Sequence, residues 1–354
     1  MRVAVAGAGA FGHNHLRVYR ELEAATAGVA LAAAVEPDAA RAAAVVENYA
    51  IPVFSTIDEL LRAGPKIDAA SVAVPTVHHH KVACALLDAG VDLLVEKPLA
   101  ATLAEADELL ALASQEKRIL QPGHLERFNP AVLAVQPQLR RPMFFEAHRL
   151  SVFTPRSLDV DVVLDLMIHD LDIVLTFANS PVREVRAVGL PILSPKVDIA
   201  NVRVEFESGC VANFTASRVS TERVRKLRFF EPRQYVSIDY ARRDLLVIRL
   251  DGSVPAEIAA AIAEGRMNPA ALAQLAAAGA GPGPGLKFVK PQVSPGEPLR
   301  LEIESFLNSV RTRREPLVTA RQGRDALALA LEIQTSMAVH AERAGLQDFF
   351  EASA

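Results

Sequence analysis

A histidine lies between two carboxylates in the segment 161–172, where Asp165, His169 and Asp172 follow one another at spacings of four and three residues. On a helix these spacings place all three side chains on one face. Carboxylates beside a histidine stabilise its imidazolium form and hold the ring in one orientation. The pattern predicts a general base that removes a proton from a hydroxyl group; the alternative is an ion-pair cluster on the surface.

A lysine follows a short apolar run. The run 91–95 is typical of a buried strand, and Glu96-Lys97-Pro98 comes directly after it. A lysine at the carboxyl end of a parallel strand can hydrogen-bond a substrate hydroxyl and stabilise negative charge on its oxygen. The alternative is that the charged pair and the proline only mark where the strand leaves the core. No tyrosine has a lysine four residues later, so histidine and lysine are the available acid–base groups.

The first twelve residues combine a strand rich in Val and Ala with a G-x-G-x-x-G pattern. In this pattern the first glycine permits a tight turn, the second lets the backbone approach a pyrophosphate, and the third lets the next helix pack on the strand. The pyrophosphate then lies on free amide groups at the positive end of that helix. We therefore predict a dinucleotide-binding loop that consists of Gly7, Gly9, Ala10, Phe11 and Gly12.

An acidic residue ends the second apolar run, 29–35, and lies 24 residues after Gly12. This residue, Glu36, can accept both hydroxyls of an adenosine ribose, and its charge would repel a 2′-phosphate. The sequence therefore predicts NAD as the cofactor. NADP is the alternative, because Arg41 is nearby, and Glu36 could also be an ordinary solvated charge.

Three consecutive histidines follow Pro75 and Thr76 at the end of the run 69–74. Thr76 is predicted to cap a helix and so to leave free amides near the cofactor. Neighbouring side chains on a helix point about 100° apart, so His78, His79 and His80 cannot converge on one ion. We expect no metal site here, and one histidine to face the cofactor.

The elements that position these residues fall into two patterns. Strands and helices alternate up to residue 123, which predicts a doubly wound parallel sheet, a Rossmann fold, with ligands beyond the carboxyl ends of its strands. Close strand-like runs without helices between them follow at 182–250 and predict a largely antiparallel open sheet in an α+β domain. The strands of the first pattern are expected at 2–6, 29–35, 69–74 and 93–95, with a helix at 99–114.

We therefore expect an NAD-binding domain at 1–123 and a substrate-binding and oligomerisation domain at 124–354. The segment 276–285, rich in Ala, Gly and Pro, is predicted to be a linker. Helices are expected around 161–177, 300–312 and 322–344, and the last two carry apolar positions at packing intervals. These C-terminal helices could pack back on the first domain.

Composition excludes several classes of protein. The net charge is −4 and the basic residues are scattered, which argues against nucleic acid as a partner. No apolar stretch reaches the roughly 18 residues of a membrane span, and no export signal is recognised, so we expect a cytoplasmic protein. The two cysteines, Cys84 and Cys210, are too few for a four-cysteine zinc site and are interpreted as small buried apolar residues.

Taken together, the glycine loop, Pro75 to His79, Glu96-Lys97-Pro98 and Asp165-x-x-x-His169 resemble the Gfo/Idh/MocA family of NAD(P)-dependent oxidoreductases. The resemblance covers nearly the whole chain. It implies that Lys97 and His169 are catalytic and that Asp165 assists them. It also places Pro75, His79 and Glu96 near the nicotinamide, and it implies a homodimer or homotetramer assembled through the open sheet.

The run Gly123-His-Leu-Glu-Arg127-Phe-Asn129-Pro130 resembles a subgroup of this family that oxidises the 3-hydroxyl of UDP-N-acetylglucosamine, a sugar nucleotide, for lipid A assembly. In that subgroup an aminotransferase partner can consume the ketone. Arg127 could hold a phosphate and Asn129 a sugar group; alternatively Arg127 forms an internal salt bridge and Asn129 only begins a turn. The rival functions are oxidation of a free sugar or inositol, and dinucleotide-dependent regulation without turnover.

Overall fold

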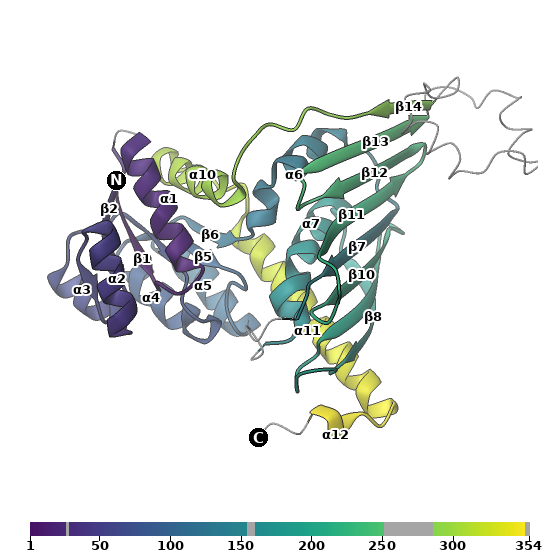
Figure 1. Ribbon diagram of the computed structural model, residues 1–354, viewed down its shortest axis with the longest axis horizontal. Coiled ribbons are helices and arrows are strands. Elements are labelled where there is room, and N and C mark those ends of the chain that lie inside the picture. Colours follow the sequence, from purple (N-terminus) through teal and green to yellow (C-terminus); the bar gives the residue numbers. More distant parts are fainter. Residues whose placement is uncertain (26–27, 154–159, 251–285, 351–354) are drawn as a thin grey trace, which may run out of the picture. The chain divides into compact units, whose positions relative to one another are not determined.

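The computed structural model describes residues 1–25, 28–153, 160–250 and 286–350. The chain divides into two compact units, and most of their helices and strands are labelled in Figure 1. The predicted linker 276–285 lies outside the described residues. Unit 1 consists of Met1–Phe128, Leu171–Ile173 and Gly296–Glu332, and unit 2 consists of Asn129–Asp170, Val174–Pro295 and Ile333–Ala354.

Unit 1 contains a parallel sheet with the strand order β3-β2-β1-β4-β5-β6. This order is that of the doubly wound Rossmann fold, as the sequence predicts. The order reverses between β1 and β4, and ligands of such sheets bind at the carboxyl ends of the strands at that point. The strands are β1 (Arg2–Ala6), β2 (Ala30–Val35), β3 (Val53–Phe54), β4 (Ala69–Val72), β5 (Asp92–Glu96) and β6 (Leu120–Gly123).

The helices of unit 1 begin where local caps direct them. Helix α5 begins at Leu103, later than predicted, because Thr102 and Glu105 form a reciprocal capping box. Helix α4 packs against both α3 and α5. The helices are α1 (Gly12–Ala25), α2 (Ala39–Tyr49), α3 (Ile57–Ala63), α4 (His79–Asp88), α5 (Leu103–Gln115), α10 (Pro298–Thr312) and the first part of α11 (Ala320–Arg343), with 3₁₀ turns η1 (Thr76–His78) and η2 (Leu125–Phe128).

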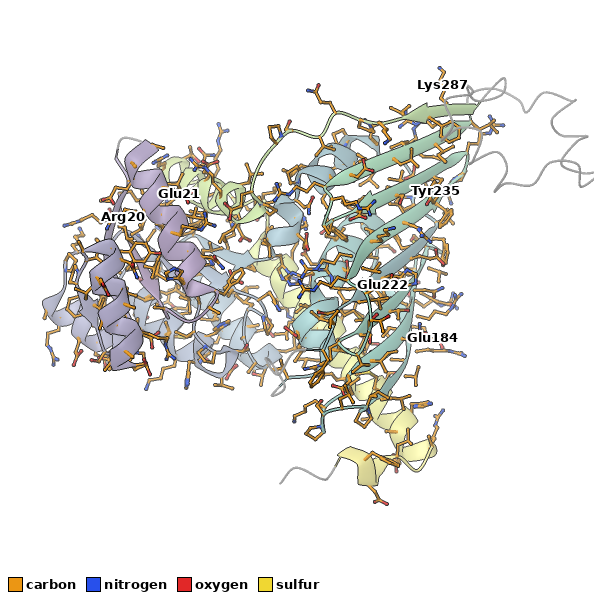
Figure 2. The ribbon with its side chains drawn as sticks, viewed as in Figure 1. Arg20, Glu21, Glu184, Glu222, Tyr235 and Lys287 are labelled. Atoms are coloured by element: carbon orange, nitrogen blue, oxygen red, sulfur yellow. The ribbon has the colours of Figure 1, made fainter. Side chains whose placement is uncertain are left out.

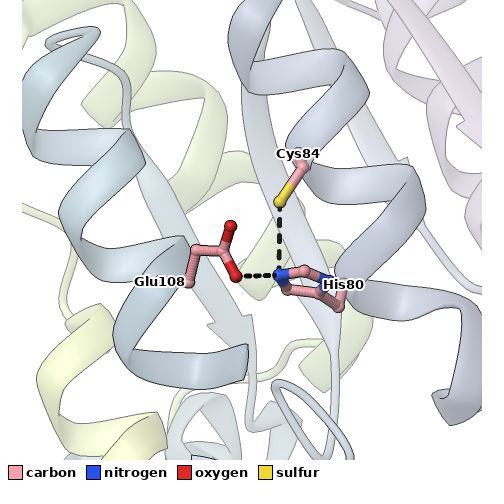
Figure 3. Close-up of side chains that lie close together, drawn as sticks. All are labelled: His80, Cys84 and Glu108. Atoms are coloured by element: carbon pink, nitrogen blue, oxygen red, sulfur yellow. Dashed lines mark hydrogen bonds and ion pairs between the residues drawn. The ribbon is translucent and has the colours of Figure 1, made fainter. Parts of the chain in front are cut away.

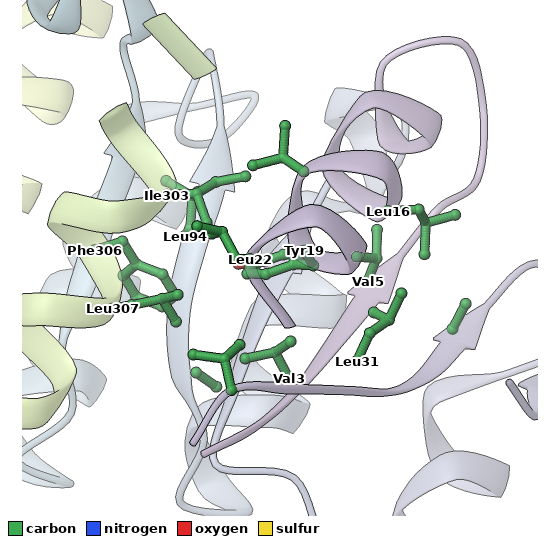
Figure 4. Close-up of a cluster of buried hydrophobic side chains, with 14 of the residues drawn as sticks. Val3, Val5, Leu16, Tyr19, Leu22, Leu31, Leu94, Ile303, Phe306 and Leu307 are labelled. Carbon is green, nitrogen blue, oxygen red and sulfur yellow. The ribbon is translucent and has the colours of Figure 1, made fainter. Parts of the chain in front are cut away.

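A continuous apolar core joins α10 to α1 and the sheet of unit 1 (Figure 4). The apolar positions 303, 306, 307 and 310 of α10 have the predicted packing intervals, and all four are buried. Packing between α1 and α10 therefore brings residues of the segment 298–312 into the core of the N-terminal sheet. The principal side chains are Val3 and Val5 from β1, Leu16, Tyr19 and Leu22 from α1, and Ile303, Phe306, Leu307 and Val310 from α10.

Unit 2 contains an eight-stranded sheet with the order β14-β13-β12-β11-β7-β10-β9-β8. All neighbours are antiparallel except β7 and β10, so the predicted largely antiparallel sheet is confirmed. The strands are β7 (Phe144–Leu150), β8 (Val182–Leu190), β9 (Ile199–Phe206), β10 (Val211–Ser217), β11 (Val224–Glu231), β12 (Gln234–Asp239), β13 (Asp244–Leu250) and β14 (Leu286–Val289).

Helices of unit 2 cover one face of this sheet (Figure 1). The helical elements of the unit are α6 (Pro130–Val135), the 3₁₀ turn η3 (Gln136–Gln138), the π-helical turn η4 (Val163–Met167), α7 (Ile168–Ala178), the end of α11 and α12 (Gln347–Phe350). Helix α6 contacts β12 and β13, and η4 contacts β10. Among the described residues, no helix combines the length and the apolar character that crossing a membrane requires.

The opposite face of the sheet carries a row of half-exposed aromatic side chains. Phe144 stacks on Phe230 with 5.5 Å between ring centres, and Phe230 lies 5.2 Å from Tyr235. Along β12 the buried residues alternate with half-exposed ones, which places Tyr235, labelled in Figure 2, on the face turned away from the covering helices. This aromatic row therefore gives the open face an apolar part.

Candidate active site

The glycine loop between β1 and α1 has the geometry that its sequence predicts. Gly7 has a φ of +91°, and a Cβ there would lie 2.7 Å from the carbonyl oxygen of Ala73. A Cβ on Gly12 would collide with the carbonyl of Gly7, whereas one on Gly9 would meet no protein atom within 4 Å. The loop therefore fits a dinucleotide, because the backbone at Gly9 can be approached closely. Ala10 and Phe11 form its exposed end.

Glu36 at the end of β2 is buried and holds the glycine loop. One carboxylate oxygen accepts a hydrogen bond from the Ala8 amide at 2.8 Å. The other accepts from the amide of Asp38 at 3.0 Å and from Arg41 at 2.8 Å. Burial by itself raises the pKa of Glu36, but the hydrogen bond from Arg41 and those from two amides hold it below its usual value. Glu36 is therefore a carboxylate that already accepts three hydrogen bonds from the protein, and only its remaining acceptor sites are available to a ligand.

We expect Glu36→Ala to weaken NAD binding by about 10- to 100-fold, because a charge-assisted hydrogen bond contributes about 1.5–3 kcal/mol. NADP affinity should fall less, since repulsion of the 2′-phosphate is lost as well. Titration of each nucleotide by protein fluorescence measures both constants, and Glu47→Ala on exposed α2 is the control. An unchanged ratio of NAD to NADP affinity would contradict the role of Glu36.

A buried hydrogen-bonded chain extends from the end of β5 to α1 and β4. Glu96 lies 2.9 Å from Nε2 of His15, whose Nδ1 lies 3.0 Å from the Ser71 hydroxyl. That hydroxyl is 2.8 Å from the hydroxyl of Tyr19. A Cβ on Gly123 would lie 2.8 Å from the Glu96 carboxylate, so this glycine makes room for it. These hydrogen bonds join β5, α1 and β4. They hold Glu96 in place and so fix the backbone of the residue that follows it, Lys97.

His79 is buried beside the same strand end. Its Nδ1 lies 2.9 Å from the carbonyl oxygen of Pro98, and its Nε2 lies 2.9 Å from that of Val74. Burial lowers the pKa of His79, so the neutral ring has one N–H to donate to the two carbonyls. The structure thus places His79 between the Lys97-Pro98 segment and the end of β4. The prediction that Thr76 caps a helix is wrong: Thr76 begins the turn η1 with no side-chain cap, after Pro75.

His169 and Asp165 belong to unit 2, and Lys97 belongs to unit 1. His169 lies in the first turn of α7 and is buried, whereas Asp165 lies in η4 and is half-buried. The helix is therefore π-helical at Asp165, not the regular α-helix that the one-face spacing assumed. A π-helical turn has an i to i+5 hydrogen bond, here from the Ile168 amide to the Val163 carbonyl, and such turns are frequent at functional sites.

A buried ion pair anchors the first turn of α7. Arg149 on β7 donates two hydrogen bonds to Asp170, at 2.7 and 3.1 Å. Its guanidinium also lies 5.2 Å from the ring centre of Tyr240. Asp170 is the neighbour of His169, so this bidentate pair fixes the position of the histidine backbone on the sheet.

Arg127 and Asn129 have internal partners. Arg127 is buried and donates to Asp172 at 3.5 Å, the internal ion pair that the sequence left as one alternative. Asp172 therefore has a partner other than His169. The Asn129 side chain accepts from the Ala131 amide at the start of α6 and donates to the Tyr240 carbonyl, both at 3.1 Å. It caps α6, in agreement with the alternative that it begins a local turn.

Comparison with known proteins matches both units to one family. A family model described as "Oxidoreductase family, NAD-binding Rossmann fold" matches residues 1–124, and one described as "GFO/IDH/MocA C-terminal domain" matches residues 131–233. The chain belongs to the Gfo/Idh/MocA oxidoreductase family. It is an enzyme of that family with an NAD-binding Rossmann domain.

Individual members of the family resemble the chain to different degrees. UDP-N-acetylglucosamine 3-dehydrogenase of Acidithiobacillus ferrooxidans is 33% identical over 97% of this chain and 99% of its own length. A solved structure of that enzyme has a TM-score of 0.80 and covers 95% and 97% of the two chains. The scyllo-inositol 2-dehydrogenase (NAD(+)) of Bacillus subtilis is 26% identical over 62% of this chain and 68% of its own. Levoglucosan dehydrogenase in complex with NADH, 17% identical with a TM-score of 0.78 over 96% and 97% of the chains, shares the fold.

Glu302 was not predicted from the sequence, although a signal existed. It lies three residues after Leu299 and four before Phe306, on the apolar face of α10. In this family member it is fully buried, and its carboxylate oxygens have no hydrogen-bond partner among the described residues. Burial raises the pKa of Glu302 well above its usual range, and the charges of Glu96 and Asp172 raise it further. The surroundings of Glu302 in the core of unit 1 thus favour the neutral, protonated form of its carboxyl group.

The raised pKa of Glu302 predicts a pH-dependent loss of stability. The pKa of Glu302 is higher in the folded protein than in the unfolded chain. The free energy of unfolding is therefore greatest below the ordinary carboxyl pKa and falls as the pH rises. The loss is about 1.4 kcal/mol per pH unit until the raised pKa is reached. We expect Glu302→Gln, which resembles the neutral acid, to remove this loss.

Denaturant midpoints measured from about pH 5 to about pH 8 test this expectation. The denaturant midpoint of Glu302→Gln should exceed that of the wild type by an amount that grows as the pH rises. Glu304→Gln changes a more exposed carboxylate on the same helix and is the control. Parallel curves for the wild type and Glu302→Gln would contradict the buried neutral acid.

A hollow of about 560 Å³ in unit 1 lies at the opposite edge of the sheet. Its lining comes from the amino ends of β4 and β5 and from α10, and includes Asp68, Asp92 and Arg313. In a parallel doubly wound sheet the cofactor binds beyond the carboxyl ends. This hollow is therefore not part of the candidate active site.

Proposed function

We propose that this oxidoreductase uses NAD to oxidise a hydroxyl group of a sugar nucleotide, specifically the 3-hydroxyl of UDP-N-acetylglucosamine to the ketone. The observation that carries the proposal is the 33% identity to the enzyme of that name, which extends over 97% of this chain and 99% of the relative. Because the similarity extends over the whole length, it includes unit 2, which is expected to bind the substrate.

NAD is the proposed cofactor, and NADP is the alternative. Support for NAD comes from Glu36, a carboxylate at the end of β2 with a lowered pKa. Arg41 is about half exposed and pairs with Glu36, and its charge could instead attract a 2′-phosphate. Pro75, Thr76, His79 and Glu96 are proposed to line the nicotinamide end, with His79 and Glu96 acting through the backbone that they fix.

In the proposed reaction the side chain of His169 accepts the proton of the substrate hydroxyl. Lys97 donates a hydrogen bond to the same oxygen and stabilises the negative charge that develops there as the carbonyl forms. Bound NAD⁺ supplies the acceptor for the hydride that leaves the adjacent carbon. Asp165 orients His169 and stabilises its protonated form. The products are a ketone, NADH and a proton held by His169.

The proposed substrate contacts are Lys97, Arg127, Asn129, Asp165 and His169. For two of them the proposal requires a change of partner. Arg127 would have to exchange Asp172 for a phosphate oxygen, and Asn129 would have to leave its cap of α6. Their internal contacts make a supporting role, in which they hold the segment 123–130 in place, the competing interpretation.

The test is the appearance of NADH absorbance when purified protein is mixed with NAD and UDP-N-acetylglucosamine, other UDP-sugars, free N-acetylglucosamine, glucose or inositols. Reduction that requires the UDP-sugar supports the proposal. Reduction with inositol instead would favour the second candidate, suggested by the inositol dehydrogenase relatives. An amine donor with an aminotransferase is added as a trap for the ketone; no signal with the trap and with bound NAD would favour a regulator without turnover.

We also propose the setting in which the reaction occurs. An aminotransferase that consumes the ketone is the expected functional partner, in the cytoplasm and in lipid A or related amino-sugar synthesis. A homodimer or homotetramer is proposed to form through the open face of unit 2, whose aromatic row provides apolar surface.

A further inference from the structure

A histidine, a cysteine and a glutamate converge on the surface of unit 1 (Figure 3). His80 and Cys84 lie one turn apart on α4, and Glu108 reaches them from α5. Nε2 of His80 lies 2.9 Å from a Glu108 oxygen and 3.5 Å from the Cys84 sulfur. All three potential ligand atoms lie within 4.8 Å of one another. None of these residues is part of the proposed catalytic machinery.

Nε2 of His80 faces both Glu108 and Cys84, and neither protonation state of this nitrogen suits both contacts. If Nε2 carries its hydrogen, it donates to Glu108, and the Cys84 thiol has no lone pair on that nitrogen to donate to. If Nε2 lacks the hydrogen, its lone pair faces a carboxylate. A cation between the three atoms would replace both contacts with favourable bonds.

The nitrogen–sulfur distance fits a small tetrahedral ion. Bonds of about 2.0–2.1 Å to nitrogen, 2.3 Å to sulfur and 2.0–2.2 Å to oxygen place the ligand atoms roughly 3.4–3.6 Å apart in a tetrahedron. The nitrogen–sulfur distance of 3.5 Å already has this value. The nitrogen–oxygen distance of 2.9 Å needs a small opening, and the Glu108 side chain is 65% exposed and able to move.

The surroundings are negatively charged. Burial raises the pKa of the Cys84 thiol, and the carboxylates of Glu108, Asp88 and Glu105 raise it further. A divalent cation would reverse this effect and hold the sulfur as thiolate. Cys84 was expected to be a small buried apolar residue, but it is half-buried and has polar neighbours. His80 and Cys84 are at i and i+4 in the sequence, a spacing that the run of three adjacent histidines obscures.

We propose that His80, Cys84 and Glu108 form a binding site for a zinc ion, with water as the fourth ligand, that links α4 to α5. Nitrogen, thiolate and carboxylate ligands together favour Zn²⁺ over Mg²⁺ or Ca²⁺, which prefer oxygen alone. Binding releases the thiol proton and constrains two neighbouring helices of the Rossmann unit.

The experiment uses the full-length protein under reducing conditions and ZnCl₂ or CoCl₂ as the probe. We expect one equivalent of metal per chain, a cobalt–thiolate charge-transfer band, and a melting temperature raised by a few degrees with saturating zinc. Cys84→Ser should abolish the band and weaken zinc binding more than about tenfold, since even changes behind the ligands cost that much. Glu108→Gln, at an exposed position, should weaken it without affecting folding.

Two matched variants separate this site from other causes. Asp88→Asn removes a neighbouring negative charge on α4 but no ligand, and Cys210→Ser removes the other thiol; both should keep the band and most of the affinity. The proposal is overturned if the wild type takes up no zinc at micromolar concentration. It is also overturned if Cys84→Ser and Glu108→Gln bind zinc as the wild type does.

Discussion

Turnover should fall by about 10²- to 10⁴-fold when Lys97 is replaced by methionine, because the oxygen of the reacting hydroxyl then loses its charged hydrogen-bond donor. Methionine keeps a straight side chain of similar length, so the fixed backbone between Glu96 and Pro98 should be preserved. The loss should occur in both kcat and kcat/KM, since the interaction strengthens in the transition state. Steady-state kinetics with the substrate found by the panel measure the effect.

Lys66→Met is the matched control for Lys97→Met. Lys66 is exposed and lies at the amino edge of the same sheet, in the hollow that was assigned no part in catalysis. It should keep wild-type turnover. NAD titration should give similar affinities for both variants, which separates a lost catalytic group from a damaged fold. Near-normal turnover of Lys97→Met would remove lysine from the mechanism.

His169→Asn should lower turnover by about 10²- to 10⁴-fold, because asparagine has no site that accepts a proton at working pH. The wild-type rise of kcat/KM with increasing pH, which a histidine base imposes, should disappear in this variant. Asp165→Asn should keep that rise with a smaller loss, since it only assists the base. The pH dependence of kcat/KM in all three proteins measures the difference.

His148→Asn is the corresponding control in unit 2, because His148 is half-buried on β7, outside the proposed machinery. It should retain both the turnover and the pH dependence of the wild type. If His169→Asn keeps the pH-dependent rise, another group is the base, and the assignment of His169 is wrong.

The N-terminal fold was predictable because the local sequence pattern and the tertiary contacts favour the same structure there. A run of buried β-branched and small residues precedes a glycine loop, and Gly7 and Gly12 admit no side chain for steric reasons. Strands β3 and β7 escaped prediction for different reasons. Strand β3 has only two residues, and β7 has charged residues between its buried ones and pairs with β10, more than 60 positions away.

The site was predicted as a set of residue types, but the roles of several depend on contacts that a sequence does not contain. Whether Arg127 is available to a ligand depends on Asp172, 45 residues later. The π-helical turn before His169 has no compositional signal, so regular helical spacing was assumed. Glu302 and the pair of His80 and Cys84 were within reach of helical periodicity, since each lies on a definable helix face.

The participation of α10 in the core of the Rossmann unit has a consequence for biosynthesis. The ribosome completes β1 to β6 long before it reaches Pro298, and at about 5–20 residues per second the interval is on the order of ten seconds or more. During that time Leu22 and its neighbours on α1 lack the cover that Phe306 and Leu307 give them. The nascent N-terminal half therefore displays an apolar surface suited to chaperones, and the nucleotide-binding half matures only after α10 has been synthesised.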